Sequence, residues 1–496
     1  MAIRGTERAP TGVAGLDQIL HGGLPSGRLY LVDGSPGVGK TTLALQFLLE
    51  GVRRGESCLY VTLSETRDEL EQVADSHGWS LEGISIIEMS QIERALMPDT
   101  RNTLFQVSDL QLNALVDLLV GEFRRLKPQR MVLDSLSEMR LMAQNPLRYR
   151  RQILALKHVF GEANCTTVLL DDRSAQGQDI QVQSIVHGMI SLQIVPLKYG
   201  INRRYLTVTK LRGSNFREGN HDYIIRRGGM VLFPRLVAAE HPVMPTNEAY
   251  SSGNEALDRL VGGGGLHAGT GTLLLGPAGS GKSTVASMFA SNACSRGKKV
   301  VYFAFDEVKR VLVERSRAMG LRFDEWLQQG LLQIHQVDPA DVAPGELAAR
   351  IVHAVEVEKV SVIVLDSLNG YVNAMPQEEF LHLHLHELLS YVNQRGVMTI
   401  MILAQTGLVG PMGAPVEVSY LADTVMLTRF FEARGSLKKA ISVVKKRSGP
   451  HEDTIREMSM SAHGVRLGEP LVQFQGVLTG VPRFMGGELE ASGDGM

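Results

Sequence analysis

The stretch LYLVDGSPGVGKTTLALQF, from Leu29 to Phe47, decides the fold. It joins an apolar run of strand length to a helix-forming run through the loop GSPGVGKT, which fits the pattern GxxxxGK[ST]. Glycines let such a loop wrap around phosphate groups with its N–H groups pointing inward, and the start of the following helix adds a positive dipole. The stretch therefore predicts a P-loop for a nucleoside triphosphate.

A second copy of this stretch lies in the other half of the chain, where TLLLGPAGSGKST runs from Thr272 to Thr284. The segment before each loop is repeated as well, since TGVAGLD at Thr11–Asp17 has the counterpart SGNEALD at Ser252–Asp258. Self-similarity over such a distance is typical of a duplicated domain. The chain is thus predicted to be a tandem duplication with one P-loop in each copy.

Each P-loop supplies a set of predicted nucleotide-binding residues. Lys40 and Lys282 are expected to reach the β- and γ-phosphates, and the hydroxyls of Thr41 and Ser283 to help hold Mg²⁺. The predicted ligands are ATP and Mg²⁺. The complete sets are Gly34, Ser35, Pro36, Gly37, Val38, Gly39, Lys40, Thr41 and Thr42 in the first copy, and Gly276, Pro277, Ala278, Gly279, Ser280, Gly281, Lys282, Ser283 and Thr284 in the second.

A P-loop also needs an acid at the end of a neighbouring strand, because Mg²⁺ must be held from a second direction. The apolar run MVLDS places Asp134 at such a strand end, and VIVLDS places Asp366 there. Both runs fit a Walker B strand. Asp134 and Asp366 are therefore the predicted metal-binding acids.

Hydrolysis further requires a group that orients or deprotonates the attacking water. The strand after the first P-loop helix ends in LYVTLSET, which offers Ser64 and Glu65, and its counterpart ends in VYFAFDEV, which offers Asp306 and Glu307. Glu65, Asp306 and Glu307 are the predicted catalytic acids. Which member of each pair acts stays open on sequence grounds.

The fold class follows from the alternation of short apolar runs with longer stretches of helical spacing. This pattern is typical of an α/β protein with mostly parallel sheets flanked by helices. The proline-containing segment 234–253 is interpreted as a linker. We expect domains at residues 1–245 and 246–475 and a mobile tail at 476–496, which is rich in glycine and acid.

Composition supports an ordinary globular protein. The chain has 496 residues, of which 44% are hydrophobic and 21% charged, and its net charge is −2. It contains no apolar run of the roughly 18 residues that span a bilayer, and its first residues lack the apolar core of a signal peptide. We therefore expect a cytoplasmic protein without a membrane partner. The sequence pI near 6.7 argues against a nucleic-acid partner.

Beyond the P-loops, the sequence resembles the KaiC-type branch of the RecA-like ATPases, which carry two such domains in tandem. The resemblance runs from TGVAGLD to FQGVLTG, and its most specific parts are FAFDE, LDSL, ADTVMLTRFFEARGSLKKAISVVKKR and IREM in the second copy. It implies two RecA-like domains and a homohexamer with ATP at the subunit interfaces. It also implies regulatory protein partners.

In this family a lysine and an arginine reach the nucleotide from the neighbouring subunit. The resemblance assigns this role to Lys210 and Arg212 of the sequence KLR, and to Lys445 and Arg447 of KKR. A cation supplied in this way neutralises charge in the transition state. All four residues are therefore predicted to take part in catalysis.

The resemblance also implies autokinase activity in the second domain, on adjacent serine and threonine residues. The aligned pair here is Ser419 and Tyr420, so the serine is kept and the threonine is not. We expect phosphorylation at Ser419 rather than an ordered two-site cycle. In the first domain the family's paired acids appear as Ser64 and Glu65, so hydrolysis there is expected to be slow unless Glu65 can substitute.

The leading hypothesis is a hexameric regulatory ATPase with serine autokinase activity in its second domain. One alternative is a nucleic-acid-dependent ATPase, because RecA-like rings commonly act on DNA. A second alternative is a scaffold in which ATP binding assembles the ring and hydrolysis is incidental.

Overall fold

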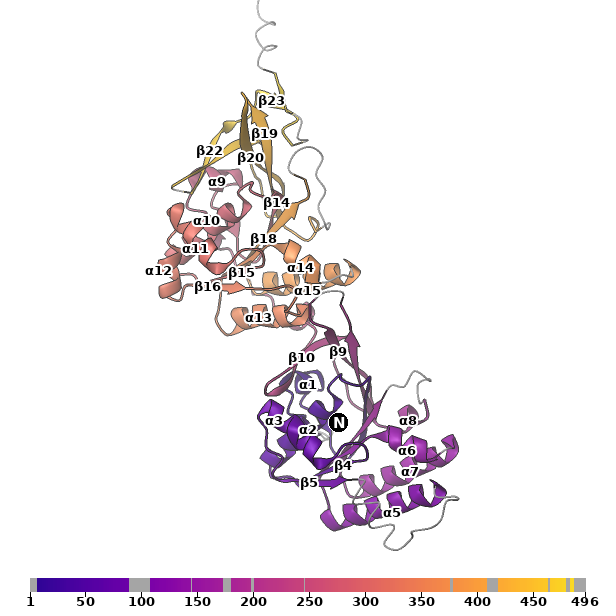
Figure 1. Cartoon of the computed structure of the whole chain (residues 1–496). Coiled ribbons are helices and arrows are strands. Elements are labelled where there is room, and N and C mark those ends of the chain that lie inside the picture. The colour runs from indigo at the N-terminus through magenta and orange to yellow at the C-terminus, as the bar shows by residue number, and fades with distance from the viewer. Residues whose placement is uncertain are drawn as a thin grey trace, which may run out of the picture. The chain divides into compact units, whose positions relative to one another are not determined.

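The computed structural model describes residues 7–88, 108–143, 145–172, 180–197, 200–244, 246–374, 378–407, 418–462, 464–478 and 482–485. The chain divides into two compact units, Met1–Arg235 and Leu236–Met496 (Figure 1). Residues 236–244, which the sequence suggested as linker, belong to the second unit. The Ala238 N–H donates to the Glu387 carboxylate at 2.8 Å, and the Met244 N–H donates to the Gln394 carbonyl at 2.6 Å. Most of the expected tail at 476–496 lies outside the described residues.

The first unit is built on a nine-stranded sheet with the order β11-β10-β9-β8-β3-β7-β6-β4-β5. Strands β8 to β5 in that order are parallel, and β9, β10 and β11 continue the sheet antiparallel. The bounds are β3 Leu29–Gly34, β4 Cys58–Thr62, β5 Ile84–Glu88, β6 Arg130–Asp134, β7 Thr166–Asp172, β8 Gly188–Val195, β9 Arg203–Leu211, β10 His221–Arg226 and β11 Gly229–Phe233.

The second unit repeats this topology in a sheet with the order β16-β15-β17-β18-β14-β19-β20-β21-β22. Its first six strands are parallel and its last three antiparallel. The bounds are β14 Gly271–Pro277, β15 Val300–Ala304, β16 Leu332–Gln336, β17 Val362–Asp366, β18 Met398–Gln405, β19 Thr424–Ala433, β20 Ser436–Lys446, β21 Arg456–Ser461 and β22 Gly464–Pro470.

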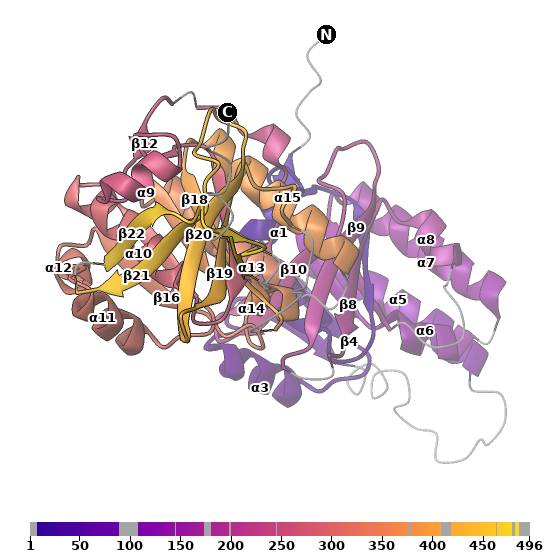
Figure 2. The same ribbon diagram turned by 90° about the horizontal axis from the view of Figure 1, so that it is seen from above.

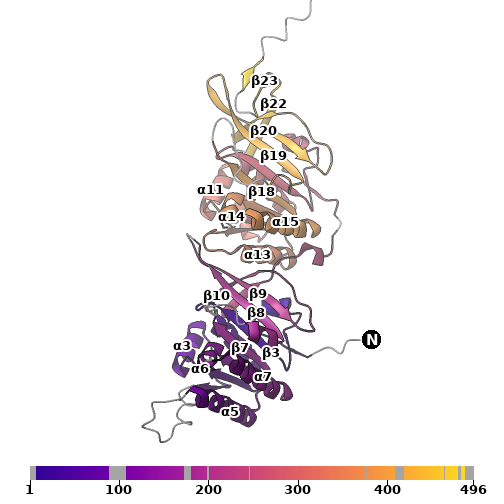
Figure 3. The same cartoon turned by 90° about the vertical axis from the view of Figure 1, so that its right-hand side faces the viewer.

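Helices cover both faces of each sheet, as Figure 2 shows for α9 to α12 and α13 to α15 of the second unit. In the first unit α1, α2 and α3 pack on one face, and α5, α6, α7 and α8 on the other; Figure 3 shows α5, α6 and α7 gathered together. The bounds are α1 Ala14–Ile19, α2 Lys40–Arg53, α3 Arg67–His77, α5 Ser108–Leu126, α6 Leu136–Ala143, α7 Pro146–Glu162, α8 Ile180–Ile185, α9 Glu255–Leu260, α10 Lys282–Ser295, α11 Lys309–Ala318, α12 Phe323–Gln328, α13 Pro344–Glu356, α14 Leu368–Ala374 and α15 Glu378–Gln394.

The remaining elements of the described residues are short and lie outside the two main sheets. They are the 3-10 helix η1 Ala238–Glu240 and the strands β1 Arg8–Ala9, β2 Leu24–Pro25, β12 Ala249–Tyr250, β13 Leu266–His267, β23 Phe474–Gln475 and β24 Arg483–Phe484. In the described part of the chain, no helix combines the length and apolar character needed to cross a membrane.

This architecture confirms the predicted fold class of two mostly parallel sheets flanked by helices. Buried apolar strands fit a parallel sheet because helices cover both of its faces. All five residues of β4 and all five of β6 are buried, for example.

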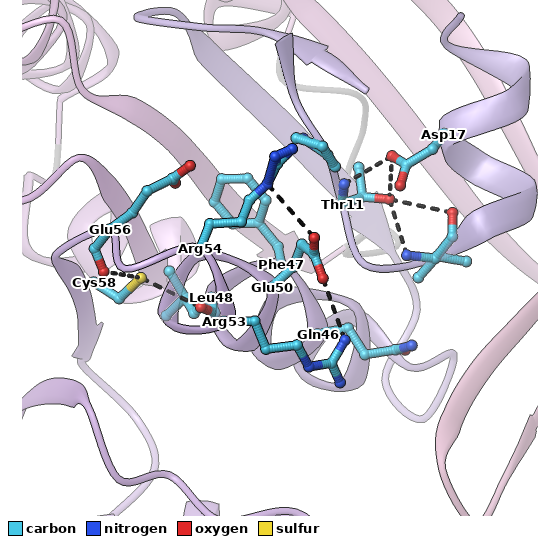
Figure 4. Close-up of polar contacts among 12 residues, drawn as sticks. Thr11, Asp17, Gln46, Phe47, Leu48, Glu50, Arg53, Arg54, Glu56 and Cys58 are labelled. Carbon is cyan, nitrogen blue, oxygen red and sulfur yellow. Dashed lines mark hydrogen bonds and ion pairs between the residues drawn. The ribbon is translucent and has the colours of Figure 1, made fainter. Parts of the chain in front are cut away.

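The repeated segments TGVAGLD and SGNEALD form the same contact in both units. Thr11 donates to Asp17 Oδ1 from its N–H at 2.7 Å and from its hydroxyl at 2.8 Å, beside helix α2 (Figure 4). The Ser252 N–H donates to Asp258 Oδ1 at 2.8 Å. Each aspartate thereby ties the chain entering a unit to the short helix that precedes the P-loop strand.

The cores of the two units differ in charge at the first position of the Walker B strand. Arg130 begins β6 and is fully buried, whereas Val362 holds the corresponding place in β17. The Arg130 guanidinium pairs with the Glu56 carboxylate and donates to the carbonyls of Pro10 at 2.6 Å and Phe47 at 2.9 Å. The first unit therefore buries a cation at a place where the second buries a valine.

Candidate nucleotide-binding sites

Each P-loop joins the central strand of its sheet to the helix that follows. In the first unit β3 ends at Gly34 and α2 begins at Lys40, and in the second β14 ends at Pro277 and α10 begins at Lys282. Gly39 and Gly281 immediately precede these helices with φ of +100° and +102°, a left-handed conformation that favours glycine. The first N–H groups of both helices thus face the loop, as an anion site requires.

The two P-loop lysines are buried and donate to their own loops. Lys40 Nζ donates to the carbonyls of Gly34 at 2.9 Å and Ser35 at 3.2 Å. Lys282 Nζ donates to the carbonyls of Gly276 at 2.8 Å and Pro277 at 2.7 Å. Burial lowers the pKa of Lys282 to about 8. Both amino groups are therefore held inside the loops that would surround the phosphates.

Lys40 has a further partner that Lys282 lacks. Its amino group lies 2.6 Å from Asp172 Oδ1, at the end of β7. Among the described residues, no carboxylate lies within ion-pair distance of the Lys282 amino group. The surroundings of the two lysines are consequently different in charge.

The two Walker B aspartates lie at the ends of β6 and β17, beside the P-loops. Burial raises the pKa of Asp134 and of Asp366, while hydrogen bonds from the Thr41 and Ser283 hydroxyls act in the opposite direction. Tyr60 donates from its hydroxyl to Asp134, and Tyr302 donates to Asp366, both at 2.6 Å. In both units, a P-loop hydroxyl and a strand-end carboxylate thus lie side by side.

Glu65 follows β4 in the first unit, where its backbone is fixed by Thr62. The Thr62 hydroxyl donates to the Glu65 carbonyl at 2.7 Å and accepts from the Glu65 N–H at 2.9 Å. Burial raises the pKa of the Glu65 carboxyl, and the charges of Asp134 and Asp172 act in the same direction. Glu65 Oε2 is buried and has no hydrogen-bond partner among the described residues. Glu65, Asp134 and Asp172 therefore form one acidic group around Lys40.

The corresponding acids of the second unit, Asp306 and Glu307, follow β15 and have different partners. Asp306 accepts a hydrogen bond from the Ser367 hydroxyl. Glu307 forms a two-pronged ion pair with Arg315 of α11, with distances of 3.2 Å from Nε to Oε1 and 2.7 Å from Nη2 to Oε2. Arg315 offsets the charge of Glu307, whereas Asp306 has no ion pair with any basic residue that the structure describes.

The four basic residues expected to act across subunits are anchored to backbone carbonyls of their own unit. Lys210 Nζ donates to the Gln183 carbonyl at 2.6 Å, and Arg212 to the Ser184 carbonyl at 2.8 Å. In the second unit Lys445 donates to the Ser419 carbonyl and Arg447 to the Tyr420 carbonyl, both at 2.9 Å. Their polar contacts within the described residues do not include the P-loop of the same unit.

The predicted phosphoacceptors, Ser419 and Tyr420, are the residues whose carbonyls accept from Lys445 and Arg447. Ser419 is half-buried, and Tyr420 has a relative exposure of 50%. The Tyr420 ring lies against His382 of α15, with ring centroids 6.0 Å apart. The structure thus presents Tyr420 to solvent and places the Ser419 carbonyl on Lys445.

Known proteins similar to this chain identify its family. The sequence model described as "ATPase: KaiC" matches residues 9–237 and 250–472. The chain belongs to the KaiC family of ATPases. The two matches cover the two units separately, in agreement with the repeated topology of their sheets.

Individual relatives resemble the chain along nearly its whole length. A circadian clock oscillator protein KaiC from Picosynechococcus sp. is 28% identical over 490 residues, which cover 97% of this chain and 93% of the relative. A circadian clock protein KaiC3 from Synechocystis sp. is 26% identical over 492 residues, which cover 97% of this chain and 95% of the relative. The chain is therefore a KaiC-like ATP-binding protein with both P-loop domains.

The sequence prediction omitted two residues that the structure places at the first site, Asp171 and Asp172. They end β7, the strand between the P-loop strand and the Walker B strand. Asp171 pairs with the Arg140 guanidinium and accepts from the Ser137 hydroxyl at 3.2 Å. The signal in the sequence was the acid pair of TVLLDDR, which closes an apolar run as the Walker B aspartate does.

Proposed function

We propose that this KaiC-family protein hydrolyses ATP in both units, assembles as a homohexamer and phosphorylates its own Ser419 in the second unit. The observation that carries the proposal is the repeated site: each unit sets a P-loop lysine, a P-loop hydroxyl, a Walker B aspartate and a further acid around one loop. The second unit keeps two acids after β15, so phosphoryl transfer to protein is assigned there.

The oxygen groups at both sites fit Mg²⁺. A hydroxyl and a carboxylate lie near each other at each site, Thr41 with Asp134 and Ser283 with Asp366, since each hydroxyl lowers the pKa of its carboxyl. Hard oxygen ligands of this kind are those that Mg²⁺ prefers. These residues would hold the ion. When bound, Mg²⁺ neutralises charge on the phosphate oxygens.

The protein's own groups then position the phosphates and the nucleophile. Lys40 and Lys282 are held by loop carbonyls at the start of the P-loop helix, so little reorganisation is needed before they bind phosphate oxygens. Asp306 orients the attacking group in the second site, because Arg315 already engages Glu307. In the first site Glu65 is the acid that follows the equivalent strand, β4.

Lys210, Arg212, Lys445 and Arg447 act on the nucleotide of the neighbouring subunit in the proposed ring. Their anchoring to carbonyls supports this, because neutral partners hold the side chains without cancelling their charge. Arg447 also lies 3.8 Å from Asp423, a longer ion pair. The neighbour's phosphates would therefore meet cations that are already oriented.

Incubation with γ-labelled ATP tests the kinase half of the proposal. The wild-type protein and Tyr420→Phe should take up label, Ser419→Ala should not, and mass spectrometry should place the phosphate on Ser419. Label that persists in Ser419→Ala and disappears in Tyr420→Phe would move the acceptor to the tyrosine. An unlabelled wild type that still releases phosphate would leave only the ATPase.

A further inference from the structure

The acids near the two P-loops come from different strands, and in the first unit one of them, Asp172, lies at the end of β7. In the second unit both extra acids, Asp306 and Glu307, follow the strand β15. In the first unit the equivalent places hold Ser64 and Glu65, so one acid is missing after β4. Asp172, on another strand, is a second extra acid near Lys40, in addition to Glu65.

The sheet register shows that Asp172 has no counterpart in the second unit. Asp172 pairs with Gly34, the first glycine of the first P-loop. The corresponding glycine, Gly276, pairs with Ala404, which has no polar side chain. The first unit therefore has an acid on the strand beside the P-loop and lacks one after β4.

The position of Asp172 is suitable for a group that acts at the γ-phosphate. P-loop lysines contact the β- and γ-phosphates, and the Asp172 carboxylate lies 2.6 Å from the Lys40 amino group. Strand β7 lies between the P-loop strand β3 and the Walker B strand β6, so its end faces the region between Lys40 and Asp134. The Asp172 carboxylate therefore borders the place where the terminal phosphate would bind.

The carboxylates of Asp172 and Glu65 differ in how well solvent water can reach them. The Asp172 side chain is 41% exposed, whereas Glu65 Oε2 is buried without a hydrogen-bond partner among the described residues. Ser64 and Asp306, the leading residues after β4 and β15, are exposed, and Asp172 is of intermediate exposure. The Asp172 carboxylate is thus more accessible than Glu65 Oε2, and it lies beside the same kind of loop as Asp306.

Asp171 fixes the end of the strand that carries Asp172. Its carboxylate is held by Arg140 and by the Ser137 hydroxyl, and the same hydroxyl accepts from the Asp172 N–H at 3.4 Å. These contacts orient the backbone at residue 172 independently of Lys40. A water-orienting group needs this kind of support, because small displacements reduce catalysis strongly.

We propose that Asp172 orients the attacking water in the first site, in the role that Asp306 has in the second. The inference rests on the proposed ATP hydrolysis by the first unit. The water oxygen forms a bond to Pγ while the bond from Pγ to the β–γ bridging oxygen breaks, and ADP leaves. One water proton stays on the inorganic phosphate and the other passes to solvent.

The test measures phosphate release and nucleotide binding in a Lys282→Ala protein, so that turnover reports the first site. Asp172→Asn keeps the shape of the side chain and removes its charge. It should lower kcat about 100-fold, a typical effect for a group that activates the nucleophile, while the Kd for ATP changes less than about threefold. The conservative Asp172→Glu should retain more kcat than Asp172→Asn.

Moving the acid from position 172 to position 64 distinguishes two roles of Asp172: orienting water and pairing with Lys40. The double variant Ser64→Asp/Asp172→Ala places the acid where the second unit has it, and should exceed Asp172→Ala at least about tenfold in kcat. Equal rates for these two variants would mean that Asp172 acts only through Lys40, which overturns the proposal. Trp79 fluorescence should show that every variant keeps the first unit folded.

Two other outcomes would also overturn the proposal, for different reasons. An Asp172→Asn protein with wild-type kcat and tighter ATP binding would show that the carboxylate merely competes with phosphate for Lys40. A Lys282→Ala parent that binds ATP in the first unit without releasing phosphate would remove first-site hydrolysis itself. Only the second result affects the proposed function.

Discussion

The first and second units have the same sheet topology and the same P-loop geometry, but they surround the P-loop lysine with different charges. Lys40 faces three acids, Glu65, Asp134 and Asp172. Lys282 has no ion pair with a described carboxylate, and Asp366 is the one acid whose charge acts on it. Glu307, after β15, is engaged by Arg315. Duplication has thus preserved the loop that holds phosphate while the groups that would act on the nucleophile have diverged.

The difference shows which parts of such a site are constrained. The glycines before α2 and α10 have left-handed backbones that few other residues adopt, so the loop itself cannot vary freely. An acid that orients water needs only to lie near the phosphate, and more than one strand ends there. The same chemistry can therefore be supplied from β4 or from β7.

The largest difference between the units should appear when each P-loop lysine is replaced in turn. Lys282→Ala should lower labelling of Ser419 by about 10²–10³-fold, because a preorganised cation at the phosphates is lost. Lys40→Ala should instead reduce hexamer assembly, which light scattering measures, while the hexamers that still form should keep Ser419 labelling. Equal loss of labelling in both variants would contradict a division of labour between the units.

The second-site acids should differ in importance because their partners differ. In a Lys40→Ala protein, Asp306→Asn should lower phosphate release about 100-fold. Glu307→Gln should lower it less than about tenfold, since both oxygens of that carboxylate already accept hydrogen bonds from Arg315. Steady-state phosphate release measures both, and Arg315→Gln serves as the control for loss of the ion pair. A larger effect of Glu307→Gln would reverse the assignment.

The sequence was sufficient to predict the strands that carry the sites, because buried parallel strands leave long apolar runs. The run before Asp134, for example, corresponds to β6, with all five residues buried. The P-loops could also be predicted from the sequence, because the glycine spacing of GxxxxGK[ST] is specific. The KaiC family followed from motifs spread over both copies, and the family match confirms it.

Asp172 could not be predicted with the same arguments, because an acid after an apolar run is commonplace. Its significance depends on strand order, which places β7 beside β3, and on the register that sets Asp172 opposite Gly34. The ion pair between Glu307 and Arg315 could not be predicted for a similar reason. Arg315 lies on α11, and only the folded structure shows that this helix brings it back to the strand end.

The charge of Lys282 should make ATP binding to the second site sensitive to pH. Burial lowers the pKa of the free lysine to about 8, and bound phosphate favours the charged form. Above pH 8 binding must therefore take up a proton, and the affinity should fall about tenfold for each pH unit. Titration calorimetry of a Lys40→Ala protein between pH 7 and pH 10, in buffers of different ionisation enthalpy, measures both effects.

Arginine is the matched control for this titration. Its guanidinium stays charged throughout that range, so Lys282→Arg should show a flatter dependence of affinity on pH, even if its affinity is lower. A wild-type affinity that is constant up to pH 10 would show that the amino group in the free site is charged. The second loop would then stabilise its lysine more than its burial indicates.

The smallest expected effect concerns stability and the buried arginine that distinguishes the first core. Glu56→Gln removes the charged partner of Arg130 while the carbonyls of Pro10 and Phe47 still accept from it, so the first unit should lose about 1–3 kcal/mol. The second unit, with Val362 at that place, should be unaffected. Its unfolding should coincide with that of the parent protein.

The two tryptophans allow the units to be followed separately, since Trp79 lies in the first and Trp326 in the second. Urea unfolding by fluorescence should shift for Glu56→Gln in a Trp326→Phe background and not in a Trp79→Phe background. Adding Arg130→Val should recover part of the loss, because an apolar residue replaces an unpaired buried charge. If Glu56→Gln instead shifted the unfolding seen by Trp326, the Arg130–Glu56 pair would not act on the stability of the first unit alone.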